Sequence, residues 1–193
     1  SSEEPGANVT GTSDMSPVQE QLELILELDP SVETIGIVFS SKEDNSYVQS
    51  AWAEDIAKEM GLTIETATVA ESADIKSAAE SLDVDAYYVL TDNMVVAGVE
   101  SIIEVAEARG VSVVTSDAGS VERGALASYA FDYYDMGVQS GKMALRILEG
   151  TAPADIPVET SEKIYLTLNP DAAERMGVTI PQSVLDRADE IVE

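Results

Sequence analysis

Hydrogen-bonding side chains gather at three points in this sequence, each where a short apolar segment ends. The residues at these points are Ser40, Ser41, Asn45 and Ser46 after the first segment, Thr91, Asp92 and Asn93 after the third, and Ser116 and Asp117 after the fourth. Hydroxyl groups and free helix N-terminal amides can receive a carboxylate, and an aspartate can pair with an ammonium group. Since these side chains hydrogen bond but are not reactive, we expect binding rather than catalysis. The alternative at each point is that the polar residue only caps the next helix.

The four apolar segments are spaced almost evenly, and a helix-periodic stretch follows each of them. They span residues 34–39, 62–67, 86–90 and 111–115. Strands that alternate with helices predict an α/β fold, here a Rossmann-like open parallel sheet with helices on both faces. Open sheets of this kind bind ligands beyond the carboxyl ends of their strands. The polar points should therefore meet at one edge of the sheet, as closely as the strand order allows.

Aromatic residues offer a second kind of contact. Tyr133 and Tyr134 stand together at the start of a later helical segment, where they could form a wall for an apolar or aromatic side chain. The alternative is that one ring packs in the core and the other lies on the surface. Trp52 shares a helical stripe with Val48 and Ile56, so we expect it in the core.

The composition excludes several classes of function. The chain has 37 acidic and 10 basic residues, a net charge of −27, so we expect no nucleic-acid partner. The sequence has no Cys and no His, which removes thiol nucleophiles, Ser-His-Asp triads and zinc sites with those ligands. It carries no P-loop and no Gly-rich dinucleotide motif. We expect no cofactor, no metal and no catalytic residue, and a carboxylate- or metal-dependent enzyme is the weakest alternative.

Several segments together resemble one protein family. They are residues 8–14, 21–25, 34–37, 91–93, 116–117, 123–127, 132–134 and 154–159. In combination they are similar to the substrate-binding proteins of an ABC-transporter group, which includes tryptophan- and other aromatic-amino-acid-binding proteins. The resemblance implies a type I periplasmic-binding-protein fold. It also implies an extracytoplasmic location, in the periplasm or at the cell surface with a lipid anchor on the full-length protein, and an ABC permease in the membrane as partner.

The resemblance further implies a ligand and its contacts. The ligand would be a small zwitterion such as an aromatic amino acid, held in a cleft between two lobes. The contacts that the resemblance implies are Ser41, Asn45, Ser46, Asp92, Asn93, Asp117 and Asp132. A ligand-sensing domain of a regulator or receptor with the same fold is the first alternative.

The sequence departs from this family in one respect, because members have two lobes and this chain begins where the first lobe would end. We expect the C-terminal lobe plus parts of the other: an entry or hinge segment at 1–14, an α/β ligand-binding lobe at 15–128, a hinge crossing with one first-lobe helix at 129–162, and a return strand with C-terminal helices at 163–193. The helix at 133–149 would then expose Met136, Met143 and Ile147. A homodimer or the missing first lobe is therefore an expected partner.

Overall fold

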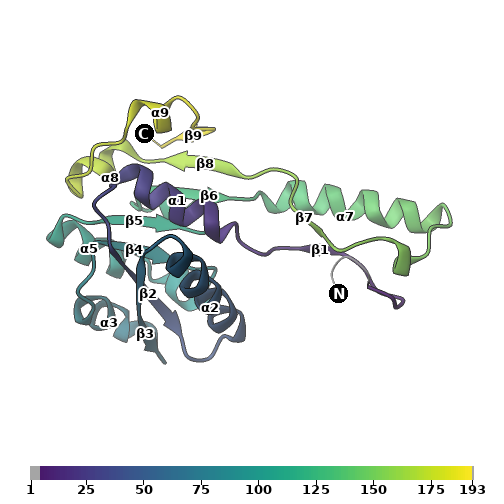
Figure 1. Ribbon diagram of the computed structural model, residues 1–193, viewed down its shortest axis with the longest axis horizontal. Helices are drawn as coiled ribbons and strands as arrows, with labels where there is room; N and C mark the ends of the chain where they lie inside the picture. Colours follow the sequence, from purple (N-terminus) through teal and green to yellow (C-terminus); the bar gives the residue numbers. More distant parts are fainter. Residues whose placement is uncertain (1–4, 193) are drawn as a thin grey trace. The chain divides into compact units, whose positions relative to one another are not determined.

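The computed structural model describes residues 5–192, which belong to two compact units (Figure 1). Among the described residues, the larger, called the α/β unit, comprises residues 17–130 and 165–192. The smaller, called the small unit, comprises residues 5–16 and 131–164. The chain therefore enters the α/β unit at Pro17, leaves it after Ala130, and returns at Tyr165.

The α/β unit is built on a seven-stranded sheet in the order β3-β2-β4-β5-β6-β8-β9. Its strands are β2 (Thr34–Ser40), β3 (Thr63–Val69), β4 (Ala86–Val89), β5 (Ser112–Thr115), β6 (Ala127–Ala130), β8 (Tyr165–Leu168) and β9 (Glu190–Ile191). All neighbouring pairs are parallel except β6 and β8. β8 follows the small unit rather than a crossover helix, so nothing obliges it to run parallel to β6. The predicted α/β fold with an open, mainly parallel sheet is confirmed.

Helices cover both faces of the sheet (Figure 1). On one face α1 (Val18–Leu28) packs against α2 (Asp44–Glu59), and on the other α3 (Ile75–Ser81) packs against α5 (Glu100–Arg109). Short helical segments complete the unit: η1 (Ser72–Asp74), α4 (Asn93–Ala97), α6 (Gly119–Glu122), α8 (Pro170–Arg175) and α9 (Gln182–Leu185).

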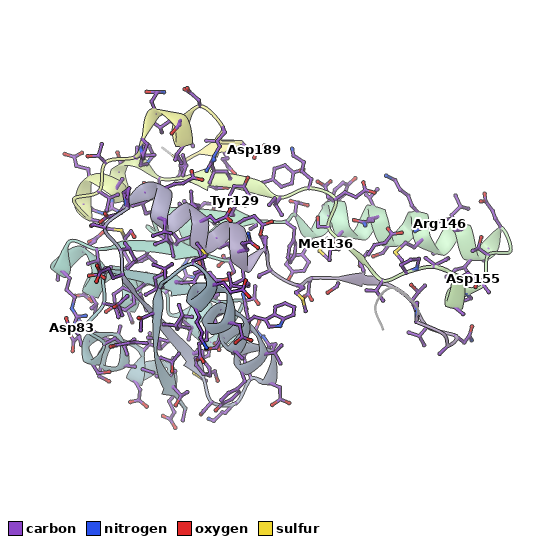
Figure 2. The ribbon with its side chains drawn as sticks, in the orientation of Figure 1. Asp83, Tyr129, Met136, Arg146, Asp155 and Asp189 are labelled. Carbon is purple, nitrogen blue, oxygen red and sulfur yellow. The ribbon has the colours of Figure 1, made fainter. Side chains whose placement is uncertain are left out.

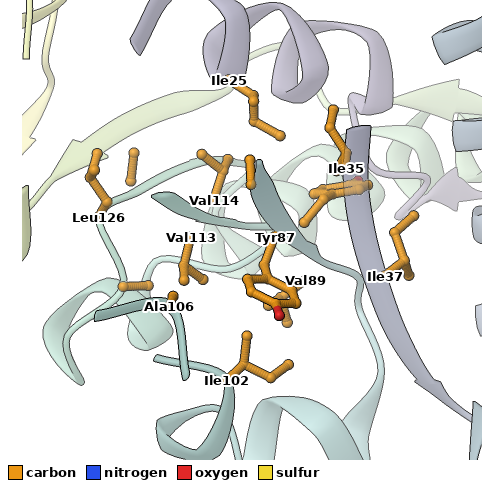
Figure 3. Packing of buried hydrophobic residues seen from close by; sticks show 14 of the residues in the cluster. Ile25, Ile35, Ile37, Tyr87, Val89, Ile102, Ala106, Val113, Val114 and Leu126 are labelled. Atoms are coloured by element: carbon orange, nitrogen blue, oxygen red, sulfur yellow. The ribbon is translucent and has the colours of Figure 1, made fainter. Parts of the chain in front are cut away.

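The core lies on both sides of the central strands. Val114 of β5 lies toward Ile25 of α1, while the preceding Val113 lies toward Ala106 of α5 (Figure 3). Successive strand residues face opposite sides, and both sides are covered. The strands therefore read as nearly continuous apolar runs, as β2 does.

Helix α2 buries a different face from the one that its apolar residues predict. Trp52 is 36% exposed and Val48 is 55% exposed, so the prediction that Trp52 lies in the core is wrong. The buried residues of α2 are Ser46, Gln49, Ser50, Ala53 and Ala57. They are small or hydrogen bonding, which lets the helix lie close to the sheet and offer polar groups to the ends of the strands.

The small unit consists of α7 (Tyr133–Leu148), η2 (Pro153–Asp155) and a parallel pair formed by β1 (Thr12–Ser13) and β7 (Glu159–Thr160). Met136 and Met143 are buried, so the prediction that they form an exposed face of this helix is wrong. The exposed apolar residues of α7 lie elsewhere on it, at Val138, Leu145 and Leu148. The argument for a dimer through the methionine face falls with that prediction.

Candidate functional site

The strand order places the carboxyl ends of β2 and β4 side by side. From β2 the chain moves outward to β3, and it then returns to the other side of β2 as β4. The order of β2 to β6 is thus the 2-1-3-4-5 order of doubly wound sheets, whose ligands bind where the direction of winding reverses. Here that point lies between the loops that follow Ser40 and Val89. Seven of the predicted site residues lie in these loops, at the end of β2, or at the starts of the helices that follow the loops.

Asp92 joins the two loops from a fully buried position. Its Oδ2 accepts hydrogen bonds from the backbone N–H of Ser40 and from the Ser46 hydroxyl, both at 2.7 Å. Its Oδ1 accepts from the backbone N–H of Val95 at 2.9 Å and so caps α4. The helix-cap alternative is therefore confirmed for Asp92, and contact of its carboxylate with a ligand stays a prediction.

Two further bridges connect the same loops. The Glu43 carboxylate, before α2, accepts hydrogen bonds from the backbone N–H of Asn93 at 3.1 Å, from its amide at 2.9 Å, and from the backbone N–H of Met94 at 3.2 Å. The Asn45 amide donates to the backbone carbonyl of Thr91 at 2.9 Å. The crevice between β2 and β4 is therefore spanned by the protein's own side chains, and a ligand would lie over this edge.

A buried amide extends the connection to β5. Gln49 of α2 accepts from the backbone N–H and hydroxyl of Thr91 through Oε1, at 3.0 and 2.8 Å. Its Nε2 donates to the Tyr88 hydroxyl at 3.2 Å and to Ser116 Oγ at 3.3 Å. Tyr88 in turn donates to Gln21 Oε1. Thr91 and Ser116, at the ends of neighbouring strands, are thus linked through one side chain.

Burial raises the pKa of the central hydroxyl of this network. Removal from water raises the pKa of Tyr88 from 10.0 to about 12, although the hydrogen bonds from Ser116 and Gln49 oppose the shift. Tyr88 therefore keeps its proton even in alkaline solution near pH 10, and it remains a donor to Gln21 there.

The predicted residues at this edge fall into an inner and an outer group. Ser40, Ser46, Asp92 and Ser116 are buried and bonded to other residues of the edge, whereas Ser41, Asn45 and Asn93 are exposed and Thr91 and Asp117 are half-buried. Asp117 accepts from the backbone N–H and hydroxyl of Ser120, at 2.8 and 2.7 Å, at the start of α6. The outer group presents hydroxyl, amide and carboxylate groups on a base that the inner group holds in place.

The remaining predicted residues, Asp132 and Tyr133, lie in the small unit. Asp132 caps α7 by accepting from the backbone N–H groups of Tyr134 and Asp135, at 2.7 and 3.1 Å. Tyr133 and Tyr134 are 66% and 79% exposed, so the alternative that one of these rings lies in the core is wrong. Tyr133 packs edge-on against Phe131, with the ring centroids 5.2 Å apart. Aromatic pairs typically have centroids about 4.5–7 Å apart. Their part in the site stays a prediction.

Comparison with known proteins decides the family. Residues 1–192 match the family of ABC transporter substrate binding proteins. The chain belongs to this family. The family is one of substrate-binding proteins, which agrees with an edge made of hydrogen-bonding groups.

Relatives in the substrate-binding family include proteins with named ligands. The chain is 34% identical over 178 residues to the tyrosine-binding protein of Clostridioides difficile (strain R20291), an alignment that covers 91% of this chain and 52% of that protein. A structure of an ABC domain in complex with L-Trp from Streptococcus pneumonia is 38% identical, with a TM-score of 0.85, and covers 100% of this chain and 66% of that chain.

A third relative was solved without ligand. The open structure of a substrate binding protein with adhesive properties from Clostridium difficile is 31% identical, with a TM-score of 0.84, and covers 100% of this chain and 65% of that chain. The present chain thus spans about half the length of the first relative and about two thirds of each solved one.

The described part of the chain lacks two other kinds of feature. Within residues 5–192, no group of three or more acidic side chains is arranged to hold a metal ion. No helix in that range is long and apolar enough to cross a membrane.

Sequence reasoning missed four residues of the edge: Gln21, Glu43, Gln49 and Tyr88. Gln49 carried a usable signal, because Ser46, Gln49, Ser50 and Ala53 form a stripe of small and polar residues at helical spacing. Such a stripe on a helix that must pack on a sheet indicates either close approach or polar partners. Glu43 carried none, since an acidic residue before a helix is ordinary.

Proposed function

We propose that this chain is the solute-binding part of an extracytoplasmic receptor that captures an aromatic amino acid for an ABC importer. The observation that carries the proposal is the polar edge at the end of β2, β4 and β5, on a chain whose relatives include a tyrosine-binding protein and a structure bound to L-Trp. Amino and carboxylate groups of such a ligand need donors and acceptors held at fixed positions.

The proposed contacts are the nine polar residues of the edge together with Asp132 and Tyr133. Asn45 and Asn93 are exposed and offer amide N–H groups to the carboxylate of the ligand. Ser41 is also exposed, and because its proton goes to the carbonyl of Val69, its hydroxyl oxygen is offered to the ammonium group of the ligand. Asp117 offers a carboxylate to its ammonium group. Asp92 supports this edge through three hydrogen bonds, and the Tyr133 ring supplies an aromatic surface for the ligand side chain.

The α/β unit is proposed to be one lobe of a two-lobed receptor, and the small unit to carry part of the hinge and of the other lobe. In the whole protein the two lobes would close on the ligand and shift an open–closed equilibrium. An ABC permease in the membrane would read the closed form, and a lipid anchor would hold the receptor at the membrane surface.

Ligand titration tests this function. The chain, and a chain extended at its N-terminus to the length of its relatives, would be titrated with L-tryptophan, L-tyrosine and other amino acids while the melting temperature and the heat of binding are measured. A ligand that binds only the native state raises the melting temperature. A shift with an aromatic amino acid supports the proposal, and no shift with any amino acid in either chain contradicts it.

Two exposed serines provide a matched test of the edge. Ser41 donates its hydroxyl to the carbonyl of Val69 beside the proposed site, whereas Ser81 donates its hydroxyl to the carbonyl of Ala78 at the end of α3. We expect Ser41→Ala to weaken ligand affinity by about fivefold, the value of one ordinary hydrogen bond. Ser81→Ala should leave the affinity unchanged. Equal affinities in the two variants would remove Ser41 from the proposed contacts.

The importer role has a separate test. Uptake of labelled tryptophan or tyrosine would be measured in cells with and without the gene for this protein. Loss of uptake on deletion supports the importer role. If uptake is unchanged while the purified protein still binds the ligand, the proposed binding function stands and the proposed importer role is wrong.

A further inference from the structure

The amide of Gln49 is the meeting point of the buried network behind the candidate site. The residue is 7% exposed, and its two amide atoms contact Tyr88 of β4, Thr91 in the loop after β4, and Ser116 in the loop after β5. Two of the proposed ligand contacts share this amide: Thr91 donates to its oxygen, and Ser116 accepts from its nitrogen. A movement of Gln49 therefore displaces both.

The directions of these hydrogen bonds fix the amide in one orientation. Thr91 presents a backbone N–H and a hydroxyl to Oε1, while the Tyr88 hydroxyl already donates to Gln21 and can only accept from Nε2. A flipped Gln49 amide would set donor against donor at Thr91. Gln21 is fixed in the same way, because its Nε2 donates to the carbonyl of Tyr129 at 2.6 Å.

We infer that Gln49 and Tyr88 are positioning residues for the ligand, which hold the Thr91 and Ser116 groups at the spacing that an amino acid requires. This inference rests on the proposed function. Neither residue needs to touch the ligand. Gln49 joins the two strand ends, and Tyr88 anchors Gln49 to Gln21 of α1 and through it to the end of β6.

Preorganisation explains why such residues matter for affinity. A ligand that binds groups already in place does not have to order them, so less of its interaction free energy is spent on ordering. Loss of the Gln49 amide leaves the Thr91 N–H and the Ser116 hydroxyl without a common partner, and they can then take other positions. Affinity should fall even though every proposed contact residue is still present.

Strand β4 supplies its own control. Tyr87 and Tyr88 are adjacent, and each is 1% exposed. The Tyr87 hydroxyl donates to the carbonyl of Ala79 at 2.7 Å and accepts from Arg109 at 2.9 Å, on the opposite face of the sheet from Gln49. Replacing either tyrosine by phenylalanine removes one hydroxyl group from a residue that is almost completely buried. Only the Tyr88 hydroxyl belongs to the network at the site.

The experiment compares Tyr88→Phe, Tyr87→Phe and Gln49→Met in the chain extended to the length of its relatives. Binding of L-tryptophan and L-tyrosine would be measured by calorimetry, and thermal unfolding would be measured in parallel. We expect both phenylalanine variants to lower the melting temperature, but only Tyr88→Phe and Gln49→Met to weaken affinity, by about tenfold each. Their combined effect should be smaller than the product of the two, because both act through one network.

The outcomes separate the inference from the function on which it rests. If the unaltered chain binds and Tyr88→Phe binds as Tyr87→Phe does, the positioning role is wrong and the proposed function stands. If the unaltered chain binds no amino acid, the proposed function is wrong and the inference falls with it. Should Gln49→Met fail to fold, the comparison of the two tyrosine variants decides alone.

Discussion

The α/β unit and the small unit are held together in different ways. In the α/β unit, one contiguous cluster of buried apolar side chains spans the sheet and the helices on both of its faces, and every member belongs to that unit. Among the described residues of the small unit, the buried apolar side chains are Met136, Met143 and Ile156. So small a core stabilises a fold weakly.

Polar contacts supply most of the remaining ties in the small unit. Gln139 of α7 donates to the Glu159 carboxylate and to the carbonyl of Thr160, both at 3.0 Å, and Arg146 forms a salt bridge with Glu159. Thr12 of β1 and Ser140 of α7 share a hydrogen bond of 2.8 Å. Partly exposed ties of this kind contribute little each. The comparison indicates that the α/β unit is a stable scaffold for the candidate site and that the small unit opens more readily.

The largest test of this difference is a cavity in each unit. Ile35 of β2 is fully buried, and Ile35→Ala should lower the free energy of unfolding of the α/β unit by about 3 kcal/mol. Met143→Ala should instead open the small unit while the α/β unit keeps its stability. Trp52 is the single tryptophan of the chain and lies in α2, so its fluorescence in a urea titration follows the α/β unit.

Hydrogen exchange completes this test by following the amides of α7. They should exchange faster in Met143→Ala than in the unaltered chain, and at an unchanged rate in Ile35→Ala under native conditions. If Met143→Ala shifts the urea unfolding transition seen by Trp52 fluorescence as far as Ile35→Ala does, the two units unfold as one. The proposed difference in their stability is then wrong.

Two aspartates that cap helices give the next test. Asp92 in the α/β unit is fully buried with three donors, whereas Asp132 in the small unit is exposed with two. Asp92→Ala leaves buried donors without an acceptor and should lower the free energy of unfolding by about 3 kcal/mol. Asp132→Ala should cost about 1 kcal/mol, because water replaces the lost acceptor.

The measurement is again a urea titration, read by tryptophan fluorescence for Asp92→Ala and by hydrogen exchange of α7 for Asp132→Ala. Asp92→Asn serves as the control that keeps the size of the side chain. It should fall between the alanine variant and the unaltered chain, since its amide can replace only part of the acceptor capacity. Equal costs for Asp92→Ala and Asp132→Ala would show that burial does not separate the two caps.

The same contrast explains what the sequence could predict. Buried parallel strands leave a strong signal, because each must be apolar on both faces, and β2, β4 and β5 lie where their apolar runs predict them. The prediction for the face of α2 is wrong, because Trp52 and Val48 do not mark the core side of the helix. The packing of α2 is instead set by small residues that allow close approach, and these carry almost no hydropathy signal.

The candidate site was predictable as a set of strand ends but not as a network. Its position follows from the rule that parallel strands end at one edge, which needs no side-chain geometry. The roles of Asp92, Gln49 and Tyr88 depend on strand order and on which way each helix faces. A single sequence gives neither the strand order nor the facing of each helix. At Asp92 it therefore cannot distinguish a helix cap from a ligand contact.

Acid provides the smallest and most local test of the comparison. The hydrogen bond from Gln139, followed by that from Arg146, holds the pKa of Glu159 below its ordinary value of 4.5. A carboxylate whose pKa is lower in the folded state stabilises that state above pH 4.5, and the stabilisation is lost as the pH falls through the lowered value. Because Glu159 ties β7 to α7, this loss should appear in the small unit.

Hydrogen exchange at matched intrinsic rates would follow α7 and β4 as the pH is lowered from 6 to about 3. We expect α7 to lose protection in this range before β4 does, and Glu159→Gln to lose part of that protection already at pH 6. Glu190→Gln, on the exposed strand β9, is the matched control and should leave α7 unchanged. If α7 and β4 lost protection together at the same pH, acid would act on the whole chain rather than on the polar ties, and the two units would not differ in what stabilises them.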